Sequence, residues 1–167
     1  MGKAIQIIRG TTAENNNYIG ALGSLSYDTD SKDLRLHDGV TLGGITIPTL
    51  VAVQRPTEAN NYTWYRKWSD GWVEQGGVGT SQQYNETNQN VTFPITMKDA
   101  KYQALLTAGE STQQSWDFGV RVAIRYTNGM DVRGGTNSNS AYTGPFFWQV
   151  CGMAATPDGG NGVPEVE

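Results

Sequence analysis

The sequence contains one cysteine, one histidine and no long apolar run. A lone Cys151 excludes a disulfide framework and a cysteine-based metal site, and we expect it to be a small buried apolar residue. No stretch approaches the roughly 20 apolar residues of a membrane-spanning helix, so we expect no membrane insertion. The apolar part of the opening segment, MGKAIQIIRG, is too short for a signal peptide, which predicts synthesis in a cytoplasm.

Positive charge is scarce as well. The chain has 12 Lys and Arg against 16 Asp and Glu, a net charge of -4, so it has no basic footprint for nucleic acid. No pattern places the single histidine, His37, in a Ser-His-Asp or Cys-His catalytic set. The sequence therefore predicts no enzyme activity, no cofactor and no nucleic-acid partner.

Glycine and small polar residues fill much of the chain. There are 21 glycines, and only 37% of the residues are hydrophobic. This composition is typical of a β-rich, loop-rich protein rather than a helical one. A length of 167 residues fits one domain or two small ones.

The first block, residues 1–50, has a strand pattern in AIQIIRG and a hairpin pattern in GSLSYDTDSKDLRLHDG. In the hairpin, Leu25 and Tyr27 alternate, DTDSKD has turn chemistry, and Leu34 and Leu36 alternate again. A lone hairpin is at best marginal in water. We therefore expect its apolar faces to be covered by the second block or by other copies of the chain.

The second block, residues 61–156, follows a predicted linker at 51–60 that Pro56 interrupts. It opens with YTWYRKWSDGWVEQGG, which predicts a hairpin. A two-residue loop at Asp70-Gly71 would place Lys67 opposite Glu74 and Trp68 opposite Val73.

Further strands are predicted along this block. NVTFPITM indicates an edge strand or a bulge because of Pro94, and KDAKYQALLTAG fits either a helix or a strand, of which we favour the strand. FGVRVAIRYTNGMDV predicts a hairpin with an Asn128-Gly129 turn, and PFFWQVCGMAA the last strand. The alternating residues expected to share a face are Val91, Phe93, Ile95 and Met97 in the first of these segments, and Val120, Val122, Ile124 and Tyr126 in the hairpin.

Two stretches carry a resemblance to a known family. GALGSLSYDTDSKDLRLHDGVTLGGITI resembles the short hairpin module of phage tail fibres and related tropism determinants. YTWYRKWSDGWVEQGG, VTFPITM and FFWQVCGMAA resemble the C-terminal receptor-binding domain of phage tail fibre proteins. The resemblance implies an all-β homotrimer in the virion that joins other tail components and attaches to a glycan or protein receptor on a bacterial surface.

The expected architecture is an N-terminal β-hairpin module at 1–50 wound around a trimer axis, then an antiparallel β-sandwich-like receptor-binding domain at 61–156. The Pro/Gly-rich, acidic tail at 157–167 is predicted to be disordered. Winding copies around an axis would bury Leu25, Leu34 and Leu36 between chains and would hide strand edges.

The tryptophans of the opening hairpin admit two interpretations. As a sugar platform, Trp64, Trp68 and Trp72 would stack on pyranose faces. As structure, they would fill the sandwich core or the subunit interface, which we favour because each ring buries a large apolar area. One ring could stay exposed.

The acidic turn and the histidine have simpler interpretations than a metal site. Asp28, Asp30 and Asp33 resemble a calcium loop, but Asp33 and Gly39 occupy the positions that require Gly and Glu, so turn-forming aspartates are predicted. Three copies of His37 could hold a metal on a trimer axis, but a turn residue is favoured.

Two long polar loops are the best candidates for receptor contact. RGGTNSNSAYTG and GTSQQYNETNQN hold adaptable hydrogen-bonding groups and tyrosines. Two other functions remain open: a monomeric, secreted, lectin-like carbohydrate-binding module, and a small polysaccharide depolymerase. The predicted receptor-binding residues are Arg133, Asn137, Asn139, Tyr142 and Tyr84.

Overall fold

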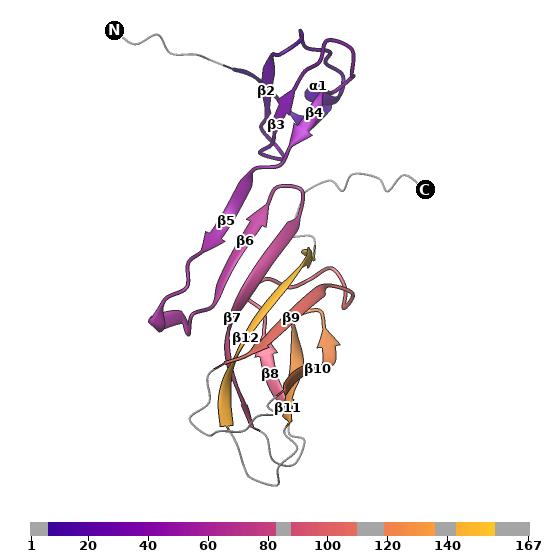
Figure 1. The fold of residues 1–167 in the computed structure, drawn as a ribbon. Coiled ribbons are helices and arrows are strands. Elements are labelled where there is room, and N and C mark those ends of the chain that lie inside the picture. The colour runs from indigo at the N-terminus through magenta and orange to yellow at the C-terminus, as the bar shows by residue number, and fades with distance from the viewer. Residues whose placement is uncertain (1–6, 83–87, 110–118, 136–142, 156–167) are drawn as a thin grey trace, which may run out of the picture. The chain divides into compact units, whose positions relative to one another are not determined.

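A computed structural model of the chain describes residues 7–82, 88–109, 119–135 and 143–155 (Figure 1). The chain divides into two compact units, mainly Met1–Val51 with Trp68–Asp70, and Ala52–Lys67 with Gly71–Thr156. Across these described ranges no helix is long and apolar enough to cross a membrane. The tail at 157–167 lies outside them.

The first unit is a four-stranded sheet in the order β1-β2-β3-β4. Its strands are β1 (Ile8–Gly10), β2 (Leu25–Asp28), β3 (Leu34–Leu36) and β4 (Ile45–Ile47). β1 pairs with β2 in parallel, and the other neighbours are antiparallel. Leu25 lies opposite Leu36 and Tyr27 opposite Leu34, which confirms the predicted hairpin.

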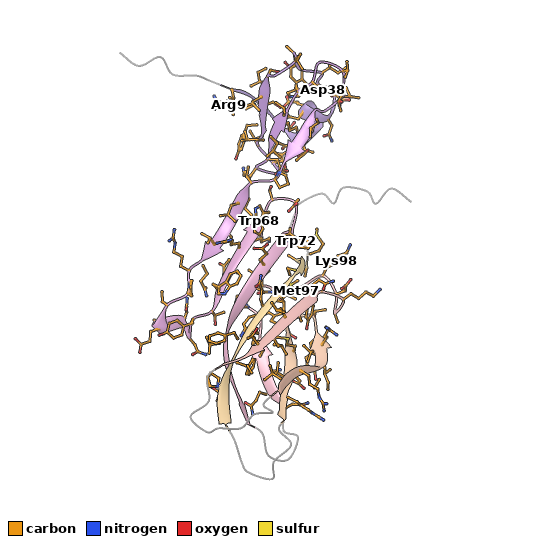
Figure 2. The ribbon with its side chains drawn as sticks, viewed as in Figure 1. Arg9, Asp38, Trp68, Trp72, Met97 and Lys98 are labelled. Carbon is orange, nitrogen blue, oxygen red and sulfur yellow. The ribbon has the colours of Figure 1, made fainter. Side chains whose placement is uncertain are left out.

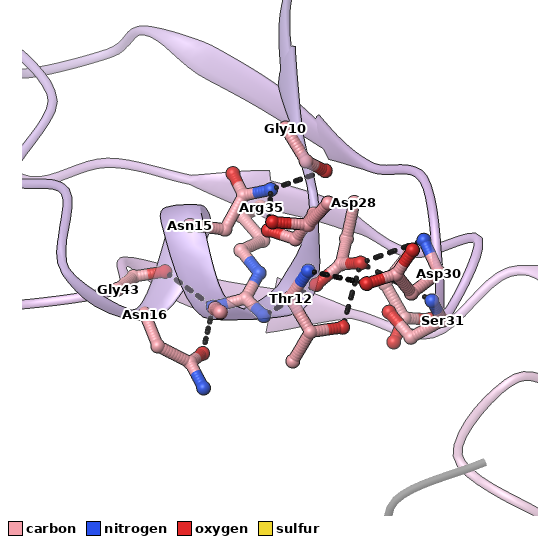
Figure 3. Close-up of polar contacts among 12 residues, drawn as sticks. Gly10, Thr12, Asn15, Asn16, Asp28, Asp30, Ser31, Arg35 and Gly43 are labelled. Carbon is pink, nitrogen blue, oxygen red and sulfur yellow. Dashed lines mark hydrogen bonds and ion pairs between the residues drawn. The ribbon is translucent and has the colours of Figure 1, made fainter. Parts of the chain in front are cut away.

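One face of this sheet is buried and polar. It lies against the short helix α1 (Thr12–Asn16), which begins with a capping box between Thr11 and Glu14. Asp28 and Arg35 form an ion pair at 2.6 Å, and Arg35 also donates to the Asn16 side chain (Figure 3). The buried polar side chains include Asn15, Ser26, Asp28, Arg35 and His37.

The opposite face of the sheet is apolar and exposed. In register, Leu25, Leu36 and Ile45 form one row, and Tyr27, Leu34 and Ile47 form the next. Leu25 is 38% exposed, Leu36 39%, Ile45 53% and Ile47 42%. We call these six residues the apolar sheet face. The sheet has polar residues inside and apolar residues outside, the reverse of the usual arrangement in a soluble protein.

The second unit is a sandwich of two sheets (Figure 1). One sheet has the order β5-β6-β7-β12-β9, and the other has the order β10-β11-β8. β11 pairs with β10 and β8, β12 with β7 and β9, and β6 with β7, all antiparallel, so the predicted all-β class with an antiparallel sandwich is confirmed. The strands are β5 (Leu50–Gln54), β6 (Trp64–Trp68), β7 (Trp72–Gln82), β8 (Gln89–Thr92), β9 (Gln103–Ala108), β10 (Gly119–Tyr126), β11 (Gly129–Gly135) and β12 (Thr143–Met153).

Residues from both sheets form the core of the sandwich. Phe93 stacks on Trp148 with ring centroids 5.6 Å apart and meets Tyr102 edge-on at 5.1 Å. Met97, labelled in Figure 2, is 1% exposed. The buried core residues are Val91, Phe93, Met97, Tyr102, Met130, Val132, Phe146, Trp148 and Val150.

Several predicted strands are confirmed with adjusted limits. KDAKYQALLTAG contains β9 and no helix. The strand expected in NVTFPITM is β8, an edge strand that ends at Thr92, before Pro94. β5 runs through residues assigned to the linker and ends two residues before Pro56. Cys151 in β12 is only half-buried, so the expectation that it is a buried residue is wrong.

The register of the tryptophan hairpin differs from the prediction. Lys67 lies opposite Val73 and Arg66 opposite Glu74. β6 ends at Trp68 and β7 begins at Trp72, so the loop has three residues and not two. The third loop residue, Gly71, has φ +88, the left-handed conformation that three-residue hairpin loops require.

The tryptophans of this hairpin do not belong to the described core. Trp64 and Trp68 are half-buried, and Trp72 is 38% exposed. The sandwich-core part of that expectation is wrong, because Trp64 lies opposite Gly76 on the outer side of the sheet, and burial at the subunit interface stays a prediction. Trp148, which is opposite Gly77 and 5% exposed, takes the core position.

The hairpin of β10 and β11 is confirmed, but its turn and its faces are not as predicted. Tyr126 pairs with Gly129, so Thr127 and Asn128 connect the strands, and Gly129 belongs to β11. A Cβ at Gly129 would lie 2.3 Å from the Val91 carbonyl oxygen, so glycine is needed there for close approach of β8.

A β-bulge interrupts β10 between Val122 and Ile124. Val122 packs against the core, but Ile124 is 45% exposed and Tyr126 40% exposed. The prediction that Ile124 and Tyr126 face the same way as Val122 is therefore wrong. The extra residue, Ala123, shifts the alternation of inward and outward side chains by one, so the side chains after it face the opposite side of the sheet from the predicted one.

Candidate functional site

One of the five predicted receptor-binding residues lies in the described part of the chain. Arg133 is half-buried in β11, and its Nε donates a hydrogen bond to the Asn88 side-chain oxygen. Tyr84, Asn137, Asn139 and Tyr142 lie outside the described residues.

Arg133 belongs to a hydrogen-bonded group on the outer face of the three-stranded sheet. At its centre, Asp131 accepts from the side-chain amides of Asn88 at 3.0 Å and Asn90 at 3.2 Å, and from the Tyr126 hydroxyl at 3.2 Å. Thr92 donates to the Asn90 side-chain oxygen at 3.2 Å. We call Asn88, Asn90, Thr92, Tyr126, Asp131 and Arg133 the polar platform.

Strand register explains why residues so distant in sequence meet there. Asp131 pairs with Asn90 on one side and with Ile124 on the other. The bulge in β10 turns Ile124 and Tyr126 to this outer face, where alternation alone would have put them in the core. Burial raises the pKa of Tyr126, and the hydrogen bond to Asp131 and its negative charge raise it further.

The polar platform adjoins both predicted recognition loops in the sequence. Asn88 directly follows residues 83–87, and β11 ends at Gly135, directly before residues 136–142. Asn88, Asn90, Tyr126 and Asp131 were not identified as site residues from the sequence. The signal that could have indicated the two asparagines is the Asn-x-Asn spacing at 88–90, directly before β-branched residues of the same strand.

A second candidate is a cleft of about 620 Å³ on the outer face of the five-stranded sheet. Its apolar walls include Leu105, which is 63% exposed, and Phe147, which is 51% exposed. Its polar groups come from Thr107, Gln149 and the Tyr62 and Trp64 rings, and none of the described residues that line it is charged. We call it the aromatic cleft, because Tyr62 and Trp64 also line it.

Glycine allows the Trp64 ring to lie on the sheet. A Cβ at Gly76 would be 2.8 Å from Cε2 and Nε1 of Trp64, so the indole covers the place of a side chain there.

Asn61 and Tyr62 have φ of 53 and 56, a left-handed conformation that is costly for bulky residues. The following Tyr62 ring is 50% exposed at the cleft.

The polar interior of the first unit leaves no role for His37 as a metal ligand. The Gly20 backbone N–H donates to Nδ1 at 3.2 Å, and Nε2 is 2.8 Å from the Ser26 hydroxyl. Because Nδ1 accepts, Nε2 must donate to the Ser26 hydroxyl. The Ser26 hydroxyl in turn donates to the Asn15 side-chain oxygen at 2.8 Å. His37 is 1% exposed, so it is a buried structural residue and not a turn residue on the surface.

Of the three aspartates predicted to form the turn, Asp28 does so, whereas the Asp33 side chain accepts from the hydroxyl of Ser69, which lies outside the turn. Asp28 accepts from the backbone N–H groups of Asp30 and Ser31, both at 3.1 Å. Asp38 caps the next turn, and hydrogen bonds from the Thr41 hydroxyl and from the backbone of Thr41 and Val40 lower its pKa to about 2. Among the described residues, no group of three or more His, Cys, Asp or Glu could hold a metal ion.

Comparisons with known proteins agree with the resemblance seen in the sequence. Residues 5–41 match the family model of the major tropism determinant N-terminal domain. No curated protein matches the chain. Because the match covers residues 5–41 alone, it supports the resemblance of the N-terminal module and not of the rest of the chain.

The fold is shared with one of the solved tail fibre structures compared. The C-terminal part of the R2 pyocin fibre of P. aeruginosa has a TM-score of 0.52 at 14% identity, over 91% of this chain and 37% of that chain. An N-truncated R2-type pyocin tail fibre has a TM-score of 0.47 at 15% identity, over 63% and 39%. The chain thus spans about two fifths of the length of these fibres. The N-terminal match and the shared fold support the resemblance to phage tail fibre proteins.

Proposed function

We propose that the chain is the receptor-binding part of a phage tail fibre, which attaches the virion to a bacterial surface as a homotrimer. The observation that carries this proposal is the match of residues 5–41 to the tropism determinant domain. The all-β fold shared with the R2 pyocin fibre adds support. The partners are then a second and third copy of the chain, other tail components, and a surface receptor, for which we favour a glycan.

The inverted sheet of the first unit supports assembly from several copies. Its apolar sheet face is exposed, whereas the polar residues beneath bond to one another in pairs such as Asp28 with Arg35. An apolar face of this kind on a soluble chain marks a contact surface. Closed symmetry would let three copies cover one another's faces and hide the edges of the sheet.

The aromatic cleft is the second surface that we assign to assembly. Among the residues that the structure describes, no charged side chain lines it, and Leu105 and Phe147 are more than half exposed. A monomeric lectin-like module would leave both apolar surfaces in water. This favours the trimer over that alternative.

We assign recognition to the polar side of the second unit. The proposed receptor-binding residues are Arg133 in β11 and, on the two polar loops, Tyr84, Asn137, Asn139 and Tyr142. Three copies would combine weak contacts and raise avidity by about 10²–10⁴ when they engage together. The chain is proposed to bind its receptor without cleaving it, and so to act in the virion as an adhesin and not as a depolymerase.

The test is binding of the labelled protein to cells of a panel of bacterial strains. We expect saturable binding to a restricted set of strains, and loss of binding after periodate oxidation of surface sugars. Loss after protease treatment instead would identify a protein receptor. Uniform or absent binding would contradict receptor recognition, and release of oligosaccharide from purified surface polysaccharide would contradict a purely adhesive role.

A further inference from the structure

We propose that the polar platform is a binding site for a neutral saccharide. The inference rests on the proposed receptor-binding function and names the ligand class and the residues that meet it. Asp131 and the amides of Asn88 and Asn90 would bind sugar hydroxyl groups, and Tyr126 with Ile124 would contact the apolar C–H face of the ring.

The hydrogen-bonding capacity of the platform fits hydroxyl groups. A carboxylate offers about four acceptor sites, and an asparagine amide offers two N–H donors. Asp131 accepts three hydrogen bonds from platform residues, and Asn88 and Asn90 each give it one. Asp131 keeps acceptor capacity, and Asn88 and Asn90 each keep an N–H donor beside it. Neighbouring sugar hydroxyls match this arrangement, because each hydroxyl both donates and accepts.

An apolar contact lies next to these polar groups. Ile124 is 45% exposed and Tyr126 is 40% exposed, on a face that otherwise presents amide, hydroxyl and charged groups. The β-bulge is what places them there, and such bulges occur next to binding sites, where they redirect side chains. A sugar ring has the same combination of a polar rim and an apolar face.

The platform is organised before a ligand arrives. Its residues lie on three strands of one sheet or at their ends, and hydrogen bonds among them fix the amides of Asn88 and Asn90. Arg133 holds the oxygen of Asn88, and Thr92 holds that of Asn90. Fixed side chains lose little conformational entropy on binding, which favours affinity.

The charge of the platform suits a neutral ligand. Asp131 and Arg133 carry opposite charges, so the six platform residues have no net charge that would select an acidic sugar, and Asp131 would repel a carboxylate or phosphate group placed beside it. The aromatic cleft is the competing site for a sugar, but its polar groups are those of Thr107, Gln149 and the Tyr62 and Trp64 rings, and none of its described lining residues is a carboxylate. The platform offers more directed polar contacts around one point.

The test uses the purified 167-residue chain on an array of purified bacterial surface polysaccharides, some neutral and some acidic. Asp131→Asn removes the central charge, and Asn90→Ala removes an exposed amide with little effect expected on folding. Asp99→Asn is the matched control, because Asp99 is an exposed carboxylate of the same unit outside the platform. Thermal unfolding verifies that each variant is folded.

We expect the wild type and Asp99→Asn to bind a subset of the neutral polysaccharides equally. Asn90→Ala and Asp131→Asn should each weaken this binding at least about tenfold. Equal binding by both platform variants, binding only to acidic polysaccharides, or loss on Trp64→Ala alone would overturn the proposal. So would absence of binding to any polysaccharide. In each of these cases strain-specific binding to cells would leave the receptor-binding function standing.

Discussion

Asp28 shows how single residues hold the first unit together without an apolar core. It is fully buried, and it accepts hydrogen bonds from the Thr12 hydroxyl, two backbone N–H groups and the Arg35 guanidinium. Burial raises its pKa, but these hydrogen bonds outweigh burial and leave the pKa below the ordinary value of 3.8. The charged form is therefore the one that stabilises the fold.

This pKa predicts acid sensitivity of the first unit. A carboxyl whose pKa is lowered by folding adds stability above its ordinary pKa and loses it as the pH falls through the folded value. We expect the melting temperature of the first unit to drop as the pH falls below 3.8, and Asp28→Asn to have a lower melting temperature at pH 7 but a weaker dependence on pH. Circular dichroism melts between neutral and acid pH measure both. An identical acid dependence in wild type and variant would contradict the assignment.

Among the elements, β7 depends on two adjacent glycines. Trp64 covers Gly76 on the outer side of the sheet, and Trp148 packs against Gly77 on the core side. A Cβ at Gly76 would lie 2.6 Å from the Trp148 carbonyl oxygen and 2.8 Å from the Trp64 ring. These glycines let one strand carry a large ring on each face.

Replacing Gly76 tests this arrangement. Gly76→Ala should destabilise the second unit by about 1–3 kcal/mol through overpacking, and should change tryptophan fluorescence. Gly119→Ala is the matched control in another strand, because a Cβ there meets nothing within 4 Å. Chemical denaturation should place this control within about 0.5 kcal/mol of the wild type. Equal stability of the two variants would show that Trp64 does not need Gly76.

Sequence reasoning predicted the elements better than their registers. Alternation of Leu25, Tyr27, Leu34 and Leu36 is a local signal, and the hairpin that it predicts is present. The extra loop residue before Gly71 and the bulge at Ala123 each shift alternation by one, which local patterns do not record.

Of the residues in the polar platform, only Arg133 was predicted from the sequence. Arg133 was identified because it flanks a long polar loop. Its platform partners could not be found from the sequence, because Asn88 and Asp131 are 43 positions apart and meet only through the pairing of β8 with β11. The buried polar face beneath the first sheet was missed too, since Ser26 and Arg35 look like ordinary exposed positions in an alternating strand.

For the whole molecule, the exposed side chains form two kinds of surface. Apolar surfaces, the apolar sheet face and the aromatic cleft, are assigned to contacts between copies. The polar platform and the polar loops are assigned to the receptor. Each assignment follows from the chemistry of the exposed side chains. A variant of an apolar surface should therefore leave receptor binding intact, and a variant of the polar platform should leave the assembly intact.

A charge placed on the apolar sheet face should break the assembly. Leu36→Glu would force a carboxylate into each contact between copies, where it would be desolvated without a partner. We expect this variant to be monomeric. Leu22→Glu is the matched control, because Leu22 is 83% exposed in the segment before β2 and lies off the apolar sheet face. An assembly unaffected by Leu36→Glu would remove this face from the interface.

The most direct test is the native mass of the purified wild-type chain, measured by light scattering during size-exclusion chromatography. The account predicts a single species with three times the chain mass of 18.2 kDa, stable on dilution. A species of 18.2 kDa would contradict it, because both apolar surfaces would then be left in water.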